Sequence, residues 1–255
     1  MMRRATFGFV ALCALAVAVP AAASRQEDDT RADAARINVR LGVEYMKQGQ
    51  LATAREKIEK ALEQNPRDPS VQFGAGLLYE QLREPEKAER HYRQALRLEP
   101  DNPDAQNALG AFLCRNGQPA KGEAAFVEAA ENPLYRTPEV AFTNAGVCAR
   151  RAGRLEQAEA YVRRALAQPA IYPEALIQMA GVSYERSNYL QARAFLQRYL
   201  DAAPATAAVL LLGHQIERAL ADEVAAKEYA VRLGTQFPES PEARILADLE
   251  REAAE

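Results

Sequence analysis

Few side chains in this sequence could form covalent bonds or bind metals: there are three cysteines and two histidines among 255 residues. His91 and His214 stand far apart, and neither is accompanied by glutamate or cysteine at a spacing typical of metal ligands. The sequence also lacks a glycine-rich phosphate loop, a nucleophile elbow and a Cys-x-x-Cys pair. We therefore predict no metal site, no cofactor and no catalytic centre.

The remaining chemistry is that of a thiol pair. Cys114 and Cys148 stand 34 residues apart, and a disulfide between them requires Cα atoms within about 7 Å and an oxidising compartment. The alternative is two small buried thiols that behave as apolar side chains. The choice depends on the elements that carry the two cysteines.

Composition predicts that these elements are helices. Apolar residues make up 48% and charged residues 26% of the chain, without tryptophan, as in ordinary soluble proteins with a buried core. Leu, Ala, Glu, Arg and Gln are abundant whereas Val, Ile and Thr are sparse, so the intrinsic preference favours helix over sheet. The formal net charge of −3 offers no concentrated basic face for nucleic acid.

One set of residue types recurs along the chain at a fixed interval. It first comprises Leu41, Gly42, Tyr45, Ala54, Ile58, Ala61 and Pro66. It returns 34 residues later as Ala75, Gly76, Tyr79, Ala88, Tyr92, Ala95 and Pro100. This period and these residue types are those of the tetratricopeptide repeat, a helix-turn-helix unit.

Weaker copies extend the pattern to six units. They cover residues 35–68, 69–102, 103–138, 139–172, 173–206 and 207–238. The spacing lengthens by two residues between the third and fourth units, which places an insertion in the loop 132–138. Since stacked units share one core, we predict an all-α fold, a right-handed α-solenoid of six repeats. Residues 239–255 have apolar side chains at helical spacing and are expected to form a C-terminal capping helix.

Interior glycines and terminal prolines have a physical reason in this fold. Glycine inside a helix costs about 1 kcal/mol relative to alanine, so we expect the repeated glycines to allow close contact between the two helices of a unit. They are Gly42, Gly76, Gly110 and Gly146. Proline lacks an N–H and disfavours helical geometry in the preceding residue. Pro66, Pro100, Pro204 and Pro238 should therefore stop the second helices.

The first helices of the units are expected to line the inner surface of the superhelix. The usual groove-facing positions give a candidate protein-binding groove made of Arg36, Val39, Val43, Met46, Lys47, Phe73, Leu77, Glu80, Gln81, Asn107, Ala111, Arg115 and Arg150. Apolar side chains exposed in a concave face generally bind a partner; the alternative is that they are buried between units. Cys114 and Cys148 fall near the ends of consecutive first helices, so we expect the disulfide rather than two thiols.

The N-terminal residues 1–23 have the features of an export signal. Arg3 and Arg4 precede an apolar run over residues 7–19, and small residues follow up to Ala23. The run has 13 residues, whereas a membrane-spanning helix needs about 20. We therefore expect cleavage after Ala23, export to the periplasm, and a flexible segment over residues 24–34.

Cys13 offers an alternative to simple cleavage, because a bacterial lipoprotein signal also ends at a cysteine. Such a signal requires a small residue before the cysteine, and here the bulky Leu12 precedes it. The apolar run also continues for six residues beyond Cys13. Cleavage without a lipid anchor is the expected outcome.

Several segments go beyond the generic repeat pattern. They are Gly-Ala-Phe-Leu-Cys at 110–114, Asn-Pro-Leu-Tyr-Arg-Thr-Pro at 132–138, Asn-Ala-Gly-Val-Cys at 144–148 and the tyrosine-rich stretch 189–200. In these segments the chain resembles the PilW/PilF family of type IV pilus biogenesis and stability proteins. The resemblance covers nearly all of the chain after the signal, and the loop 132–138 is its most specific part.

This resemblance implies a periplasmic pilotin, which helps the outer-membrane secretin to be localised and assembled into its ring. The groove would capture a segment of the secretin, without a small-molecule substrate. Family members are typically lipoproteins of the outer membrane; because Cys13 lacks an acceptable signal, membrane contact is expected to be indirect, through the secretin. The alternatives are a general periplasmic scaffold for cell-envelope assembly and an enzyme with an unrecognised site.

Overall fold

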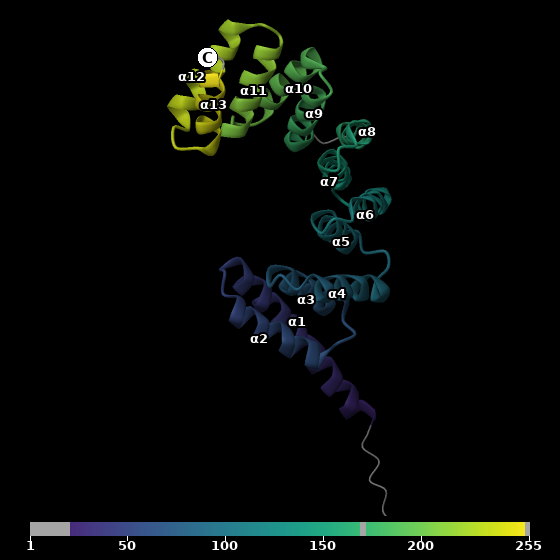
Figure 1. Cartoon of the computed structure of the whole chain (residues 1–255). Coiled ribbons are helices and arrows are strands. Elements are labelled where there is room, and N and C mark those ends of the chain that lie inside the picture. Colours follow the sequence, from purple (N-terminus) through teal and green to yellow (C-terminus); the bar gives the residue numbers. More distant parts are fainter. Residues whose placement is uncertain (1–20, 169–171, 253–255) are drawn as a thin grey trace, which may run out of the picture.

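The computed structural model describes residues 21–168 and 172–252, which form thirteen α-helices and no strand (Figure 1). The first three repeats contain α1 (Ala21–Lys47), α2 (Leu51–Gln64), α3 (Pro69–Gln81), α4 (Pro85–Leu98), α5 (Pro103–Arg115) and α6 (Pro119–Glu131). The next three contain α7 (Pro138–Arg151), α8 (Leu155–Leu166), α9 (Pro173–Glu185), α10 (Tyr189–Ala202), α11 (Ala207–Ala219) and α12 (Glu223–Gln236). A final helix, α13 (Pro241–Glu252), follows them. The predicted all-α solenoid is confirmed.

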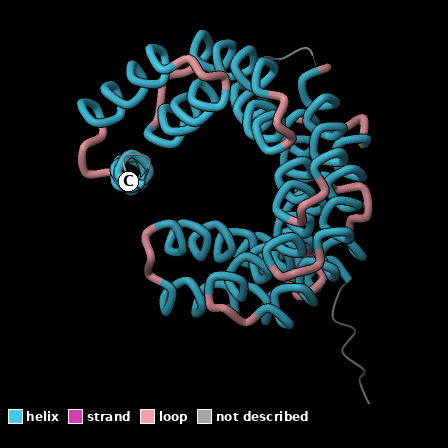
Figure 2. The backbone as a smooth tube through the Cα atoms, turned by 45° about the horizontal axis from the view of Figure 1, so that its top comes forward, coloured by secondary structure: helices cyan, strands magenta, loops and turns pink. Residues whose placement is uncertain are grey.

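The helix pairs stack into a curved solenoid. Each second helix packs against the first helix of the next repeat, as α2 packs against α3 and α6 against α7. First helices also contact one another, for example α1 with α3 and α7 with α9, whereas the described second helices make no comparable contact among themselves. The first helices therefore line the shorter, inner side of an open ring (Figure 2).

Helix ends follow the turn signals of the sequence. Helices α2, α4, α10 and α12 all end two residues before a proline. Asp68 caps the start of α3 by accepting a hydrogen bond from the Ser70 N–H, and Asn102 caps α5 in the same manner. Helix α7 begins at Pro138, one residue before the predicted start of the fourth repeat, because proline suits the first turn of a helix.

The segment 24–34 is helical, so the expectation of a flexible segment is wrong. It belongs to α1, which begins at Ala21 and has 27 residues, whereas the other first helices have 13 or 14. The segment contains neither glycine nor proline, and extending an existing helix costs far less than nucleating one. An ion pair of 3.7 Å between Arg36 and Asp33 supports this extension. Most of the predicted signal peptide, including Cys13, lies in residues 1–20, outside the described residues.

The repeated glycines lie where the two helices of a repeat touch. A Cβ atom added to them would come within 2.9 Å of a large side chain on the second helix: Ile58 for Gly42, Tyr92 for Gly76, Phe126 for Gly110 and Val162 for Gly146. Atoms of different residues do not approach so closely without displacement. The prediction that these glycines allow close contact between helices is confirmed.

The sixth repeat shifts this contact by one residue, because a Cβ atom added to Gly213 of α11 would lie 2.6 Å from the Tyr229 ring of α12. His214 occupies the position that glycine holds in the first four repeats, and the position that holds the large partner is occupied by Ala230. The His214 side chain is buried, and its Nδ1 lies 3.0 Å from the carbonyl oxygen of Ala226. At this contact too, a glycine of the first helix faces a large side chain of the second helix, one position earlier than in the first four repeats.

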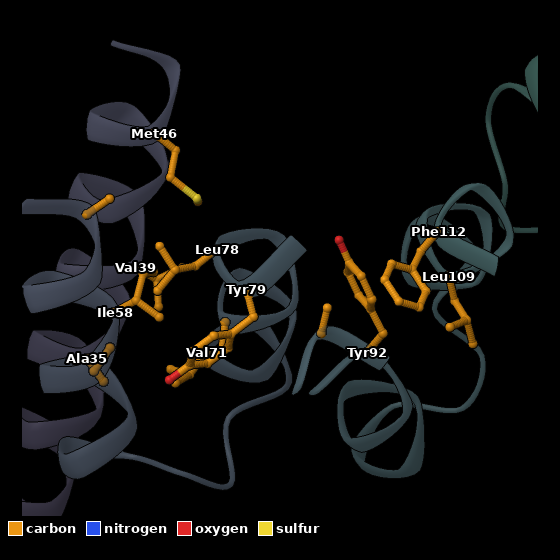
Figure 3. Close-up of a cluster of buried hydrophobic side chains, with 14 of the residues drawn as sticks. Ala35, Val39, Met46, Ile58, Val71, Leu78, Tyr79, Tyr92, Leu109 and Phe112 are labelled. Atoms are coloured by element: carbon orange, nitrogen blue, oxygen red, sulfur yellow. The ribbon is translucent and has the colours of Figure 1, made fainter. Parts of the chain in front are cut away.

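Buried clusters extend across the boundaries between repeats. Val39 of α1, Ile58 of α2 and Leu78 of α3 belong to one buried cluster (Figure 3). The same cluster extends to α4 and α5, where the ring centroids of Tyr92 and Phe112 are 5.6 Å apart. Because each repeat covers the apolar face of its neighbour, most of the buried clusters include residues of more than one repeat.

Helix α13 covers the C-terminal end of the stack. Its Leu246 is buried in a cluster with Leu210 and Leu211 of α11 and Leu233 of α12. The predicted capping helix is therefore present, and Figure 2 shows it end-on at the inner side of that end of the ring. Within residues 21–168 and 172–252, no helix is both long and apolar enough to cross a membrane.

Candidate functional site: the inner surface of the solenoid

The structure divides the predicted groove residues into three groups. Exposed side chains are those of Arg36, Lys47, Gln81 and Arg115. Partly buried side chains are those of Val43, Phe73, Leu77, Glu80, Asn107, Ala111 and Arg150. Val39 and Met46 are buried, with exposed fractions of 7% and 5%. Eleven of the predicted side chains are therefore accessible, and two are not.

The assignment of Val39 and Met46 to an accessible groove is wrong, because both belong to the core cluster. A Cβ atom on Gly74 of α3 would lie 2.8 Å from Cγ1 of Val39. The missing side chain at Gly74 lets α1 and α3 approach closely, so Val39 fills the seam between them. Gly74 is not part of the repeat pattern. The groove prediction used the positions of an average repeat, in which the first helices lie farther apart and the residue at the Val39 position is accessible.

An apolar floor remains accessible across the first three repeats. It consists of Val43 on α1, Phe73 and Leu77 on α3, and Ala111 on α5, all partly buried. The Phe73 ring is held at a centroid distance of 5.9 Å from the Tyr92 ring, so its position is fixed from below. A fixed, partly exposed aromatic ring is the kind of feature that anchors protein partners.

An ion pair between neighbouring repeats borders this floor. Arg115 Nε of α5 donates to Glu80 Oε1 of α3 at 3.0 Å, and the Tyr92 hydroxyl donates to Glu80 Oε2 at 2.8 Å. Burial of the phenol, aided by the Glu80 carboxylate, raises the pKa of Tyr92 far above its ordinary range. Tyr92 therefore serves as a permanent hydrogen-bond donor that holds Glu80 in place.

A second polar link joins the first two repeats. Asp68 is buried and accepts hydrogen bonds from the Ser70 N–H at 2.8 Å and from Arg36 Nε at 2.9 Å. Burial alone would raise the pKa of Asp68, but the hydrogen bonds from Ser70 and the charge and hydrogen bond of Arg36 outweigh burial and lower it. Arg36 is thereby oriented along the edge of the groove.

Arg150 is seated on the inner face of the fourth and fifth repeats. Its Nη2 lies 2.7 Å from Glu185 Oε1, and its Nη1 donates to Gln178 Oε1 at 3.1 Å. A Cβ atom on Gly181 would be 2.7 Å from Arg150 Nη1, so the guanidinium lies against the bare backbone of α9. Arg150 is thus committed to contacts within the chain.

Cys114 and Cys148 are joined by a disulfide bond, with Cα atoms 5.8 Å apart. Cys114 lies near the end of α5 and Cys148 near the end of α7, so the bond links the first helices of the third and fourth repeats. It bridges the step at which the longer loop interrupts the regular spacing. Groups of histidine, cysteine or carboxylate side chains able to hold a metal are absent from the described part of the chain.

Two apolar side chains at the N-terminal end were not among the predicted site residues. Ile37 and Leu41 of α1 are 49% and 43% exposed. Their equivalents in the second repeat, Val71 and Ala75, are fully buried against the preceding repeat. Among the described helices, no repeat precedes the first one to cover these two side chains. The repeat pattern places them at positions that normally face the preceding repeat, so the sequence could have identified them as exposed.

Comparison with known families gives the class of the protein. A tetratricopeptide repeat family model matches residues 39–89 and 113–175, and another tetratricopeptide repeat model matches residues 70–112. These matches together span more than half of the chain. The six helix pairs and their glycine-lined contacts agree with this class, and the chain belongs to the tetratricopeptide repeat proteins.

Individual relatives narrow this assignment. The type IV pilus assembly protein PilF of Pseudomonas aeruginosa is 26% identical over 215 residues, which cover 84% of this chain and 85% of PilF. The crystal structure of PilW, a widely conserved type IV pilus biogenesis factor, superimposes with a TM-score of 0.75 at 32% identity, covering 84% of this chain and 98% of PilW. A solved structure of P. aeruginosa PilF superimposes with a TM-score of 0.72 at 25% identity, covering 86% of this chain and 99% of that chain. The chain is a member of the PilW/PilF family.

Proposed function

We propose that this protein is a scaffold of type IV pilus assembly that acts as a pilotin-like partner of the outer-membrane secretin. The groove of repeats one to three would bind a segment of the secretin subunit, prevent its premature aggregation and guide its assembly into the ring. The kinship with PilF and PilW supports the pilus system as the setting. No catalytic step is part of this proposal.

One observation carries the proposal: the inner face presents a pre-formed apolar floor with charged edges. Phe73 and Leu77 lie on adjacent turns of α3, pack against the buried cluster of the first repeats and remain partly exposed. Lys47 and Arg115 lie at the edges and are exposed. An apolar strip between charges fits an extended or helical protein segment with apolar side chains on one face and polar ones on the other.

We also propose that the protein works in the periplasm, after removal of residues 1–23, and contacts the membrane only through the secretin. The disulfide between Cys114 and Cys148 supports this location, because such bonds persist in oxidising compartments and are rare in the cytosol. Mass spectrometry of the mature N-terminus tests the proposal. A chain that starts at Ser24 supports it, and a diacylated Cys13 contradicts the unanchored form.

The groove is tested by charge substitution on its floor. Phe73→Glu and Leu77→Lys place charges where the proposal requires apolar contact, so capture of the secretin from solubilised envelopes should fall at least tenfold. The matched control is Leu190→Glu, which adds a charge at a side chain that is 71% exposed on the second helix α10. Circular dichroism at 222 nm verifies that each variant keeps its helices.

The result is decisive in either direction. Loss of secretin capture with Phe73→Glu and Leu77→Lys but not with Leu190→Glu supports the groove. Unchanged capture and normal secretin rings in cells that carry both groove variants would exclude this surface. Capture of a different envelope protein, with no secretin, would instead favour a general scaffold.

A further inference from the structure

A hollow separate from the proposed groove lies at the other end of the inner surface. It is bounded by α9, α11 and α13 and has a volume of about 360 Å³. Its walls are formed by Tyr184, Gln215, Ala219 and Leu249, with His214 as the most deeply buried residue of the lining. The volume lies near the lower limit of ligand sites, roughly 300–1,000 Å³, and is large enough for an aromatic side chain with part of its backbone.

His214 gives this hollow a defined chemistry. The side chain is only 6% exposed, and its Nδ1 lies 3.0 Å from the Ala226 carbonyl oxygen. A carbonyl can only accept, so Nδ1 carries a proton, and in the tautomer with this single ring proton Nε2 is an acceptor. Within the described residues, Nε2 has no hydrogen-bond partner, and it is not sealed from the surface either. This acceptor belongs to the one buried side chain in the lining of the hollow.

The rim disfavours a charged ligand. Arg218 and Glu250 stand at the hollow with opposite charges, and Arg218 also faces Glu223 at 3.7 Å. A carboxylate or phosphate would be attracted by Arg218 but repelled by Glu250 and Glu223. The Tyr184 ring and the Leu249 side chain supply apolar walls instead. The mixed rim charges, the apolar walls and the histidine acceptor together favour a neutral, flat and mainly apolar ligand group. Such a group needs a hydrogen-bond donor at the end that enters the hollow most deeply.

We propose that this hollow binds a tyrosine side chain of a protein partner, with the phenol O–H donating to His214 Nε2. The donor of a phenol is at the far tip of the ring, where it can reach an acceptor at the floor while the ring packs between Tyr184 and Leu249. The indole N–H of tryptophan lies on the side of its ring and is not directed to the floor. The proposal does not depend on the secretin contact, since the hollow and the N-terminal groove share no residue.

Nuclear magnetic resonance of the histidine side chains tests this site, because the chain has only two histidines. The probes are p-cresol, which mimics the tyrosine side chain, and toluene, which lacks only the hydroxyl. At pH 8.5, where imidazole side chains are ordinarily neutral, p-cresol should shift the Nε2 resonance of His214 and leave that of His91 unchanged. A single hydrogen bond should make p-cresol bind about threefold to tenfold more tightly than toluene.

Two variants separate the hydrogen bond from the apolar walls. His214→Phe keeps the ring but removes the acceptor, so p-cresol and toluene should bind it equally. Leu249→Arg changes a wall residue that is 39% exposed and should weaken both probes without disturbing the fold. Leu134→Arg, at a side chain 74% exposed in the α6–α7 loop, should affect neither.

The proposal is overturned if p-cresol at millimolar concentration leaves the His214 resonance unmoved, or if wild-type protein binds the two probes with equal affinity. Should His214→Phe fail to fold, Leu249→Arg and the comparison of the two probes on the wild-type chain still decide the question. A p-cresol shift that survives Leu249→Arg unchanged also counts against the hollow, because the probe would then be bound elsewhere.

Discussion

At the scale of single residues, two glycines within helices differ in whether packing requires them. Gly76 has no side chain because Tyr92 occupies the space: an added Cβ would lie 2.7 Å from the Tyr92 ring. Gly234 lies in the last turn of α12, and an added Cβ there would meet nothing within 4 Å. Only the first glycine is required by packing within the chain.

The substitution Gly76→Ala should therefore destabilise the protein, by about 1–3 kcal/mol, because the gain in helix propensity does not offset overpacking against Tyr92. The matched control Gly234→Ala should stabilise it by up to about 1 kcal/mol. Urea unfolding followed by circular dichroism measures both. Equal effects of the two substitutions would contradict the close-contact explanation of the repeated glycines.

Asp68 gives a residue-scale prediction with a pH dependence. Its pKa is lowered in the folded protein, so its charged form stabilises folding above the ordinary aspartate pKa of about 3.9. That contribution is lost as pH falls through the folded pKa. Asp68→Asn keeps an oxygen for the Ser70 N–H but loses the ion pair with Arg36, and should cost about 1 kcal/mol at pH 7.

Urea midpoints at pH 7 and pH 3 check this prediction, because the difference between wild type and Asp68→Asn should narrow at pH 3. Asp33→Asn is the control, since Asp33 forms a 3.7 Å pair with the same arginine but its side chain is 76% exposed. It should change stability by less than about 0.5 kcal/mol at either pH. A difference for Asp68→Asn that stays constant down to pH 3 would show that its charge is not involved.

At the scale of elements, the sequence predicts the features that follow from the spacing of residues along the chain. Helix pairs, their proline stops and the contact at each interior glycine all follow from a spacing of 34 residues. The helical start of α1 could not be recognised in this way, because residues 24–34 have no apolar periodicity and are helical only as an extension of a packed helix. Val39 was misassigned for a tertiary reason, the close approach that Gly74 permits.

The disulfide is a prediction at this scale, because it joins α5 to α7 across the irregular loop. Cross-linking residues 34 apart restricts the unfolded chain, so removing the bond should cost about 2–4 kcal/mol. The double variant Cys114→Ala/Cys148→Ala is compared with the wild type in urea, with and without dithiothreitol. Reductant should lower the wild-type midpoint to that of the variant and leave the variant unchanged; an effect on the variant would indicate another cause.

At the scale of the whole molecule, the sequence gives the order of the repeats but not the hollow at their C-terminal end. That hollow needs Tyr184, His214 and Leu249, which stand on three helices and belong to no common motif. Only the placement of α13 on the inner side of the last repeats brings them together. The departure of His214 from the glycine pattern was visible in the sequence, but its orientation depends on the carbonyl of Ala226.

The final prediction concerns how stability is distributed along the solenoid. If repeats stabilise only their neighbours, deleting residues 239–255 should loosen α11 and α12 and leave α1 to α8 unchanged. Loss of the buried Leu246 contact alone removes about 1.5–3 kcal/mol, so amide exchange in α11 and α12 should accelerate roughly tenfold to a hundredfold.

Hydrogen exchange with mass spectrometry resolves these segments, and Leu249→Ala is the matched control because that side chain lies on α13 but outside its buried cluster. It should leave exchange in α11 and α12 nearly unchanged. The disulfide makes the comparison more informative, since it ties the third and fourth repeats together and should mark the point where loosening stops. Uniform acceleration from α1 to α12 would instead mean that the solenoid unfolds as one cooperative unit.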